Sequence, residues 1–140
     1  MKKNLLSAAF SLSLIFAPAA VTTAFAAPTA VRVTASDSSG DLSYPMLYTE
    51  SSWMSLEVPV AVLGGTIPGD LSLDAGALAA GTTITLDSVS QQGDMALLRV
   101  TVSRADTGVS IDQLANINVQ SGGQTLATLS IPVIGAAIGD

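Results

Sequence analysis

The sequence predicts an all-β protein with antiparallel strands, and three observations support this fold class. Val, Ile and Thr are abundant, whereas the helix-favouring residues Lys, Glu and Gln are scarce. Apolar and polar residues alternate with a period of two along several short runs. Turn sequences rich in Gly separate these runs about every ten residues. These features indicate short strands that bury one face and expose the other.

Residues 1–26 show the three regions of an export signal in the expected order. Lys2 and Lys3 supply positive charge, and an apolar run of about thirteen residues follows them. Ala24-Phe25-Ala26 then places small residues one and three positions before the expected cleavage site. We therefore expect a signal peptide that is removed by cleavage after Ala26.

The apolar run Leu5–Ala17 argues against the alternative of an uncleaved membrane anchor. It is shorter than the roughly 18–20 residues that cross a bilayer, and Pro18 interrupts it. No Cys follows that could carry a lipid. We expect an exported protein that has no membrane span in its mature form. It is expected in the periplasm, at the cell surface or outside the cell.

Residues 27–140 are expected to form one domain, because they contain no repeat of solenoid length, no low-complexity tract and no linker. A chain of this size buries about 65% of its unfolded surface, which suffices for one stable core. The sequence contains no Cys, so core burial has to hold the fold without disulfides.

Eight segments have the composition and alternation of strands. The third of them has the clearest pattern, because Met54, Leu56 and Val58 alternate with polar or smaller residues. Pro59 cannot donate a ladder hydrogen bond, so we expect this strand to lie at a sheet edge or to carry a bulge there. The expected strands are Thr29–Ala35, Tyr44–Thr49, Trp53–Leu63, Leu71–Asp74, Thr82–Val89, Met95–Ser103, Asn116–Gln120 and Thr125–Val133.

The connections between these segments contain turn residues. Gln91-Gln92-Gly93-Asp94 and Ser121-Gly122-Gly123-Gln124 are expected to close hairpins, because Gly supplies the positive φ of short loops. Ala75–Gly81 and Ser110–Ala115 are each expected to hold one helical turn. Seven to eight short strands with such turns are typical of an antiparallel immunoglobulin-like β-sandwich, with a small β-barrel as the alternative.

Two stretches of the chain carry a likeness to a known family. They are Leu78-Ala79-Ala80-Gly81-Thr82-Thr83-Ile84-Thr85 and Leu97-Leu98-Arg99-Val100-Thr101-Val102, which a predicted hairpin joins. The run that contains them, Gly69–Ser103, resembles the repeating modules of bacterial surface and adhesion proteins. The resemblance implies an immunoglobulin-like fold and carries no functional residue across.

The expected mature residues contain no His, Cys or Lys, and this excludes most catalytic chemistry. Ser–His–Asp triads, Cys–His pairs, thiol redox centres and most zinc sites cannot be built. A pair of carboxylates is the remaining option. Glu50 and Glu57 are the only Glu residues, and a spacing of seven on an extended strand places them on opposite faces. We expect no catalytic residues, and a carboxylate-dependent hydrolase is the least favoured class.

The charge of the mature chain narrows the range of partners. Three arginines stand against eleven Asp and Glu, which gives a formal net charge of −8. Such a protein repels polyanions, so nucleic acid and anionic membrane surfaces are not expected partners.

No cofactor is expected, and the one candidate that the oxygen-bearing side chains offer is a structural calcium ion. Asp106, Ser110 and Asp112 supply ligand oxygens within one loop, and Asp37 and Asp41 bracket another. Neither loop has the spacing of an EF-hand, and an ordinary turn is the alternative for each.

The aromatic residues of the mature chain are Tyr44, Tyr48 and Trp53, which lie within ten residues of one another. Rings presented together can stack on a sugar face or anchor a partner protein. Trp53 lies on the strand face opposite Met54, which favours exposure. The alternative is that these rings pack into the core or a strand edge.

The terminal segments Ala27–Ala35 and Leu129–Ile138 have few charges and either pair within their own domain or add to a neighbour's sheet. We therefore expect a non-catalytic structural, adhesive or fibre-forming subunit that contacts other subunits or itself through strand edges. The alternative is a carbohydrate- or protein-binding module, including a periplasmic inhibitor, that binds through Tyr44, Tyr48 and Trp53.

Overall fold

The structure, a computed structural model, describes residues 30–139. The expected signal peptide, residues 1–26, lies outside the described residues. Among residues 30–139, no helix has the length and apolar character that a membrane crossing requires.

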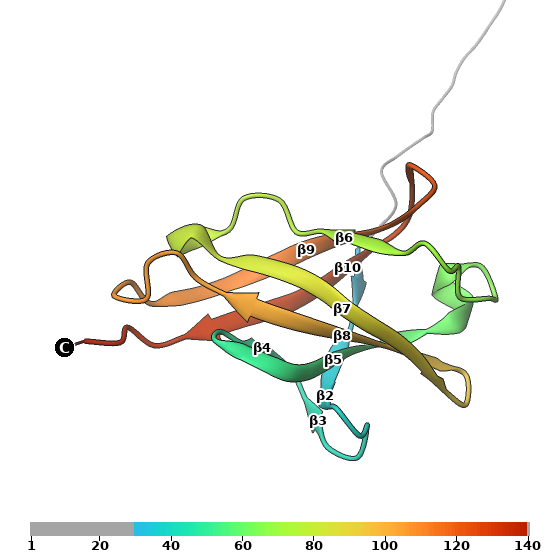
Figure 1. The fold of residues 1–140 in the computed structure, drawn as a ribbon, viewed down its shortest axis with the longest axis horizontal. Coiled ribbons are helices and arrows are strands. Elements are labelled where there is room, and N and C mark those ends of the chain that lie inside the picture. The colour runs from blue at the N-terminus through green and yellow to red at the C-terminus, as the bar shows by residue number, and fades with distance from the viewer. Residues whose placement is uncertain (1–29, 140) are drawn as a thin grey trace, which may run out of the picture.

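The described residues fold into strands with two short 3₁₀ helices, η2 (Val60–Leu63) and η3 (Ala79–Gly81) (Figure 1). The sequence therefore predicted the all-β class correctly. The strands are β1 (Val31–Arg32), β2 (Thr34–Asp37), β3 (Ser43–Tyr44), β4 (Leu47–Tyr48), β5 (Ser51–Pro59), β6 (Ser72–Asp74), β7 (Thr83–Gln92), β8 (Met95–Ser103), β9 (Ile111–Ser121) and β10 (Gln124–Gly135).

The strands form two sheets that pack face to face. The first, here called the β5 sheet, has the order β3-β2-β5-β8-β7 with antiparallel neighbours throughout. The second, the β10 sheet, has the antiparallel order β10-β9-β6, and β1 and β4 pair in parallel with β10 on its other side. Two separate sheets make a sandwich and not the alternative small barrel. The immunoglobulin-like type of the sandwich stays a prediction.

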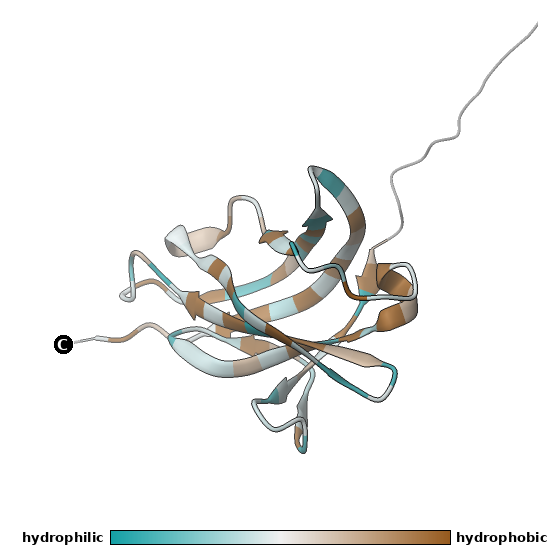
Figure 2. Cartoon of the chain, turned by 45° about the vertical axis from the view of Figure 1, so that its right-hand side comes forward, coloured by the Kyte–Doolittle hydropathy of each residue, from teal (hydrophilic) through white to brown (hydrophobic). Residues whose placement is uncertain are grey.

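Aliphatic side chains fill the space between the sheets. The predicted inward faces are confirmed on β8 and β10, whereas Val31 and Leu86 are only partly buried. Figure 2 shows the alternation of hydrophobic and hydrophilic residues along the strands. Each fully buried Leu, Ile or Val contributes about 1.5–3 kcal/mol, so this cluster can hold the fold. It comprises Val33, Ala35, Leu47, Met54, Leu56, Val58, Val60, Leu63, Ile84, Ala96, Leu98, Val100, Val102, Ile111, Ala115, Ile117, Val119, Ala127, Leu129, Ile131 and Val133.

The predicted strand Trp53–Leu63 needs two corrections. It ends at Pro59, and Val60–Leu63 forms η2 instead. The strand is also central and not at an edge, because β2 and β8 flank it. Pro59 fits this position because it is the last residue of β5 and lies beyond the pairing with β2, which stops at Glu57. The bulge occurs at the opposite end of the strand.

The predicted helical turn at Ser110–Ala115 is wrong, because β9 begins at Ile111. Gln113 occupies an inward-facing position and Leu114 an outward one, so the period-two pattern is obscured there. The Gln113 side chain accepts a hydrogen bond from the Ala79 N–H at 2.9 Å, at the start of η3. This η3 turn is the part of the predicted Ala75–Gly81 turn that forms.

Both predicted hairpins are confirmed, and each has a two-residue loop. Gly122 and Gly123 have φ angles of 59° and 81°, which a residue with a side chain rarely adopts. Gly135 serves a different purpose. A side chain there would collide with Thr49, so the glycine permits the close approach of the segment after β4 to β10.

Candidate functional site

Three strands bring the aromatic residues together on the surface. Tyr44 lies on β3, Tyr48 on β4 and Trp53 on β5. The ring centroids of Tyr44 and Trp53 are 5.5 Å apart, and those of Tyr44 and Tyr48 are 6.2 Å apart. Both pairs meet edge to face, the geometry that aromatic quadrupoles favour. We call these three residues the aromatic surface.

The members of the aromatic surface differ in exposure. Tyr44 is half-buried and packs against the core, so it supports the other two rings from beneath. Trp53 is 40% exposed and Tyr48 is 38% exposed. The alternative of a core aromatic thus describes Tyr44 in part, whereas Tyr48 and Trp53 present ring area to solvent.

A β-bulge in β5 presents Trp53. Ser51 pairs with Val102 and Met54 with Val100, so Ser52 and Trp53 together stand opposite one residue of β8. Both bulge residues are exposed. Trp53 points outward because it directly precedes the inward-facing Met54, and the bulge places Ser52 on the exposed side as well, so that Ser51 can face inward.

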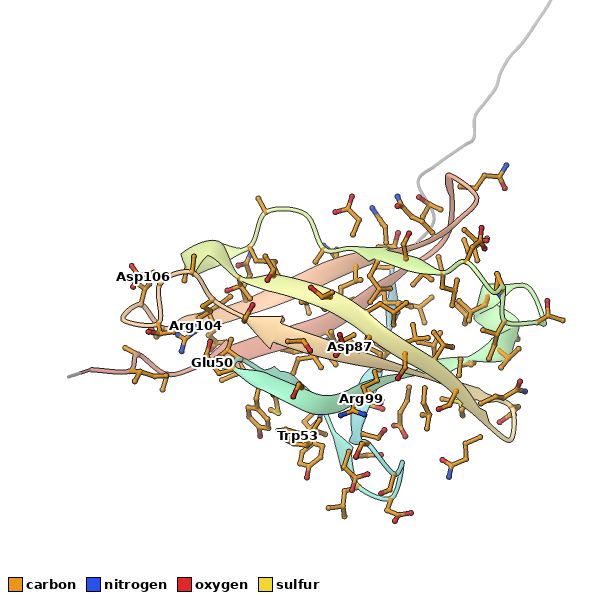
Figure 3. The ribbon with its side chains drawn as sticks, viewed as in Figure 1. Glu50, Trp53, Asp87, Arg99, Arg104 and Asp106 are labelled. Atoms are coloured by element: carbon orange, nitrogen blue, oxygen red, sulfur yellow. The ribbon has the colours of Figure 1, made fainter. Side chains whose placement is uncertain are left out.

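Arg99 of β8 stabilises this bulge. Its Nε donates a hydrogen bond of 3.0 Å to the Ser52 carbonyl oxygen, a group that the bulge removes from the regular ladder. Figure 3 shows the Arg99 side chain beside the region that carries Trp53. The hydrogen bond holds the guanidinium at the residue that precedes Trp53 in the chain.

Hydrogen bonds also fix the strands on either side of the rings. The Ser51 hydroxyl donates to the Tyr48 carbonyl oxygen at 2.6 Å and closes the turn between β4 and β5. The Glu57 carboxylate accepts from the hydroxyls of Thr34 and Ser43 at 2.8 and 3.1 Å, which ties β2 and β3 to β5. These hydrogen bonds hold the backbone that carries the rings in one conformation, which lowers the entropy cost of binding.

An ion pair between a buried arginine and a partly exposed carboxylate lies at the β4–β5 turn, and nothing in the sequence pattern predicted it. The Arg104 side chain is fully buried, and its Nε and one terminal nitrogen donate to the two Glu50 carboxylate oxygens at 3.0 and 2.6 Å. The same guanidinium donates to the carbonyl oxygens of Val109 and Ala136. The hydrogen bonds from Arg104 lower the pKa of Glu50 from its usual 4.5, and they outweigh the opposing effect of desolvation.

The structure corrects the placement of Glu50 on an extended strand. Glu50 lies in the turn between β4 and β5 with a φ of 54°, and its carboxylate binds Arg104. Glu57 lies on β5 and binds hydroxyl groups of β2 and β3. Each carboxylate is thus engaged in a structural contact of its own, and the expectation of no catalytic residue stays a prediction.

The predicted calcium ligands have local partners. The Asp106 carboxylate accepts a hydrogen bond from the Gly108 N–H at 3.0 Å and forms a turn. Ser110 is exposed after that turn, and Asp112 is exposed on β9. Among residues 30–139 no group of three or more His, Cys, Asp or Glu side chains is arranged to hold a metal ion. Calcium binding by Asp106, Ser110 and Asp112 stays a prediction.

The second acidic loop is also an organised turn. The Asp37 carboxylate accepts hydrogen bonds from the Ser39 hydroxyl and from the Asp41 and Leu42 N–H groups. Desolvation acts to raise the pKa of Asp37, but these hydrogen bonds together with one from Gly40 exceed it and lower the pKa.

The terminal segments pair within the same chain. Val31 and Arg32 of β1 lie beside Leu129 and Ser130 of β10, and β10 pairs with β9 along its whole length. This is the alternative that the sequence analysis set against strand exchange. Exchange between subunits stays a prediction.

Comparison with known proteins gives no relative of this chain, since no family model, curated protein or solved structure matches it.

Proposed function

We propose that this chain is an exported, non-catalytic contact protein, a structural or adhesive subunit that binds through the aromatic surface. The observation that carries the proposal is the exposure of Trp53 and Tyr48, whose rings both pack edge to face against Tyr44. Folded proteins bury most large aromatic area, and a braced group of exposed rings is typical of a binding hot spot. The signal-like residues 1–26 and the lack of His, Cys and Lys in the mature chain support export and a non-catalytic role.

A carbohydrate is the ligand that we favour as the alternative to a protein partner. The exposed indole and phenol offer flat apolar faces, and Arg99 is bound to the neighbouring Ser52 carbonyl oxygen. A sugar ring requires this combination, because its C–H face is apolar and its hydroxyl groups need polar partners.

The order of the strands supports the immunoglobulin-like part of the proposal. When the two-residue strands β1, β3 and β4 are left out of the two five-stranded sheets, β2-β5-β8-β7 oppose β10-β9-β6, a division into four and three. Constant-type immunoglobulin domains divide seven strands in the same way. Such sandwiches present their strand edges and outer faces for contact with other proteins.

The test uses the mature chain, residues 27–140, labelled at its N-terminus and applied to arrays of immobilised glycans and bacterial surface extracts. Trp53→Ala and Tyr48→Ala should each weaken binding by about tenfold or more, as expected for hot-spot aromatics. Trp53 is the single Trp, so its fluorescence reports a glycan directly in the wild type and in the Tyr48→Ala variant.

Leu114→Ala is the matched control, because Leu114 is 50% exposed on β9 in the other sheet. It should bind like the wild type. Thermal denaturation of every variant separates loss of binding from loss of folding. Retained binding in both aromatic variants would refute the aromatic surface, and substrate turnover that depends on a single carboxylate would refute the non-catalytic role.

A further inference from the structure

A second candidate binding site lies at the edge of the sandwich, away from the aromatic surface. It is a pocket of about 430 Å³ between the segment that precedes β6 and the second half of β7. Apolar side chains contribute much of its wall, and Val89 is 37% exposed there. The lining residues are Ile67, Pro68, Gly69, Leu71, Val89, Ser90 and Gln91.

The pocket adjoins a free strand edge. β7 is the last strand of the β5 sheet and pairs only with β8 among the described strands. All of its residues from Asp87 to Gln92 are exposed. A strand edge presents N–H and C=O groups that can pair with another extended chain. In strand addition the backbone supplies affinity, and a neighbouring pocket selects a side chain.

A bulge divides the free edge into two parts. Leu86 pairs with Val100 and Ser88 with Arg99, which leaves Asp87 as the extra residue. Its carboxylate accepts a hydrogen bond from the Thr101 hydroxyl. A bulge with a charged residue discourages pairing across it. The segment after the bulge, Ser88–Gln92, has no charge and lies against the pocket.

Three carboxylates lie close to the pocket residues in the sequence. Asp70 stands between two lining residues, Asp87 precedes Val89 by two positions, and Asp94 lies in the turn that follows β7. A hydrogen bond from the Ser121 hydroxyl lowers the pKa of Asp70 against a smaller effect of desolvation, so this carboxylate is charged at neutral pH.

One of the three arginines is close to this edge, since Arg99 of β8 pairs with Ser88. Its Nε donates to the Ser52 carbonyl oxygen on β5, while Arg104 is bound to Glu50 and Arg32 lies on β1 in the other sheet. Three carboxylates against this one arginine leave a net negative charge around the pocket and the free edge, which favours a cationic partner and disfavours a second copy of this acidic chain.

We infer that the free edge of β7 binds an extended segment of a partner polypeptide that carries an aliphatic side chain flanked by Lys or Arg. The segment pairs with Ser88–Gln92, the aliphatic side chain enters the pocket, and the basic side chains lie near Asp70 and Asp87.

The probe is the capped peptide Lys-Val-Thr-Val-Lys, titrated into ¹⁵N-labelled mature protein and followed by amide shifts in NMR spectra. We expect shifts confined to Asp87–Gln92 and the pocket wall, with a Kd on the order of 0.1–1 mM. The matched peptide with Glu in place of both Lys should bind at least about fivefold more weakly. Neither peptide is expected to contact the aromatic surface, so Trp53→Ala should leave the affinities for both peptides unchanged.

Gly69→Leu tests the pocket, because a Cβ at Gly69 meets no heavy atom within 4 Å and its φ is not positive. The larger side chain should fill the space, keep the Tm and weaken peptide binding by about fivefold or more. Asp87→Lys should weaken binding by about threefold or more, whereas Asp112→Lys, the same charge change on β9, should not.

Several outcomes would overturn the inference. They are equal binding of the basic and acidic peptides, shifts outside the pocket and β7, and unchanged affinity in folded Gly69→Leu. A concentration-dependent dimer that forms through β7 without peptide would also overturn it, in favour of a second copy as the occupant.

Discussion

At the scale of single residues, Arg104 has the largest structural role of any charged side chain that the structure describes. Its guanidinium joins the β4–β5 turn through Glu50, the loop after β8 through Val109 and the C-terminal segment through Ala136. Loss of a buried partner in such a network leaves unpaired polar groups, which is more costly than the loss of a surface pair. Arg104→Ala should therefore lower the Tm by roughly 5 °C or more.

The pair predicts a definite pH dependence of stability. The pKa of Glu50 is lower in the folded state than its usual 4.5, so ionised Glu50 stabilises the fold. This contribution is complete above pH 4.5 and is lost as the pH falls through the lower, folded-state pKa. Glu50→Gln should thus have a lower Tm than the wild type at pH 6–7, and the difference should close as the pH falls through the folded-state pKa of Glu50.

The measurement is thermal denaturation of both proteins from pH 7 down to acid conditions. In an Arg104→Gln background, Glu50→Gln should no longer change the pH profile, because the partner is absent. A difference between wild type and Glu50→Gln that stays constant down to about pH 2 would contradict the argument.

Glu50 and Arg104 also illustrate why the sequence did not predict this contact. They are 54 residues apart, and single-sequence patterns carry no signal for such a pairing. Glu50 further adopts a positive φ, which is uncommon for a residue with a side chain. The aromatic residues were easier to find because they are close in sequence, although their mutual geometry depends on the pairing of three strands.

At the scale of strands, alternation was a good guide wherever one face is uniformly apolar. The predicted bounds of Met95–Ser103 agree with β8, and its expected inward residues Ala96, Leu98, Val100 and Val102 are fully buried. The prediction failed where side chains on the inward face are polar, as at Gln113 of β9. It also failed at Pro59. Proline has no N–H to donate to a neighbouring strand, and the last residue of a central strand avoids that loss just as an edge position does.

A pair of Leu substitutions tests the orientation of the strands. Leu98 is fully buried on β8, so Leu98→Ala should lower the free energy of unfolding by about 2–5 kcal/mol. Leu114 is 50% exposed on β9, so Leu114→Ala should change it by only about 0.5 kcal/mol. Urea denaturation measures both values, and equal losses would show that one of the two strands faces the wrong way.

At the scale of the whole molecule, the net negative charge and the lack of cysteine determine how the stability of the fold responds to conditions. Residues 27–140, the expected mature chain, carry a formal net charge of −8 and contain no Cys. Burial of the hydrophobic core therefore has to offset the repulsion between like charges without help from disulfides. The two-layer architecture could be inferred from the number and length of the strands. The parallel pairing of β1 and β4 with β10 could not, because two-residue strands leave no periodic signal.

Salt should therefore stabilise this protein. Raising NaCl from about 10 mM to about 500 mM shortens the Debye length from about 30 Å to a few ångströms, and the Tm should rise by a few degrees. At matched ionic strength, CaCl₂ and MgCl₂ should give equal shifts. A larger shift with calcium that Asp106→Asn abolishes would instead establish the calcium site of Asp106, Ser110 and Asp112.

The position of β10 in the chain has a consequence for biogenesis. This strand joins β9, β1 and β4, so the β10 sheet cannot close until residues 124–135 have been synthesised. Contacts of such long sequence separation form slowly. A chain emerging from the ribosome thus stays without its final topology until late in synthesis, which would suit the export that we propose.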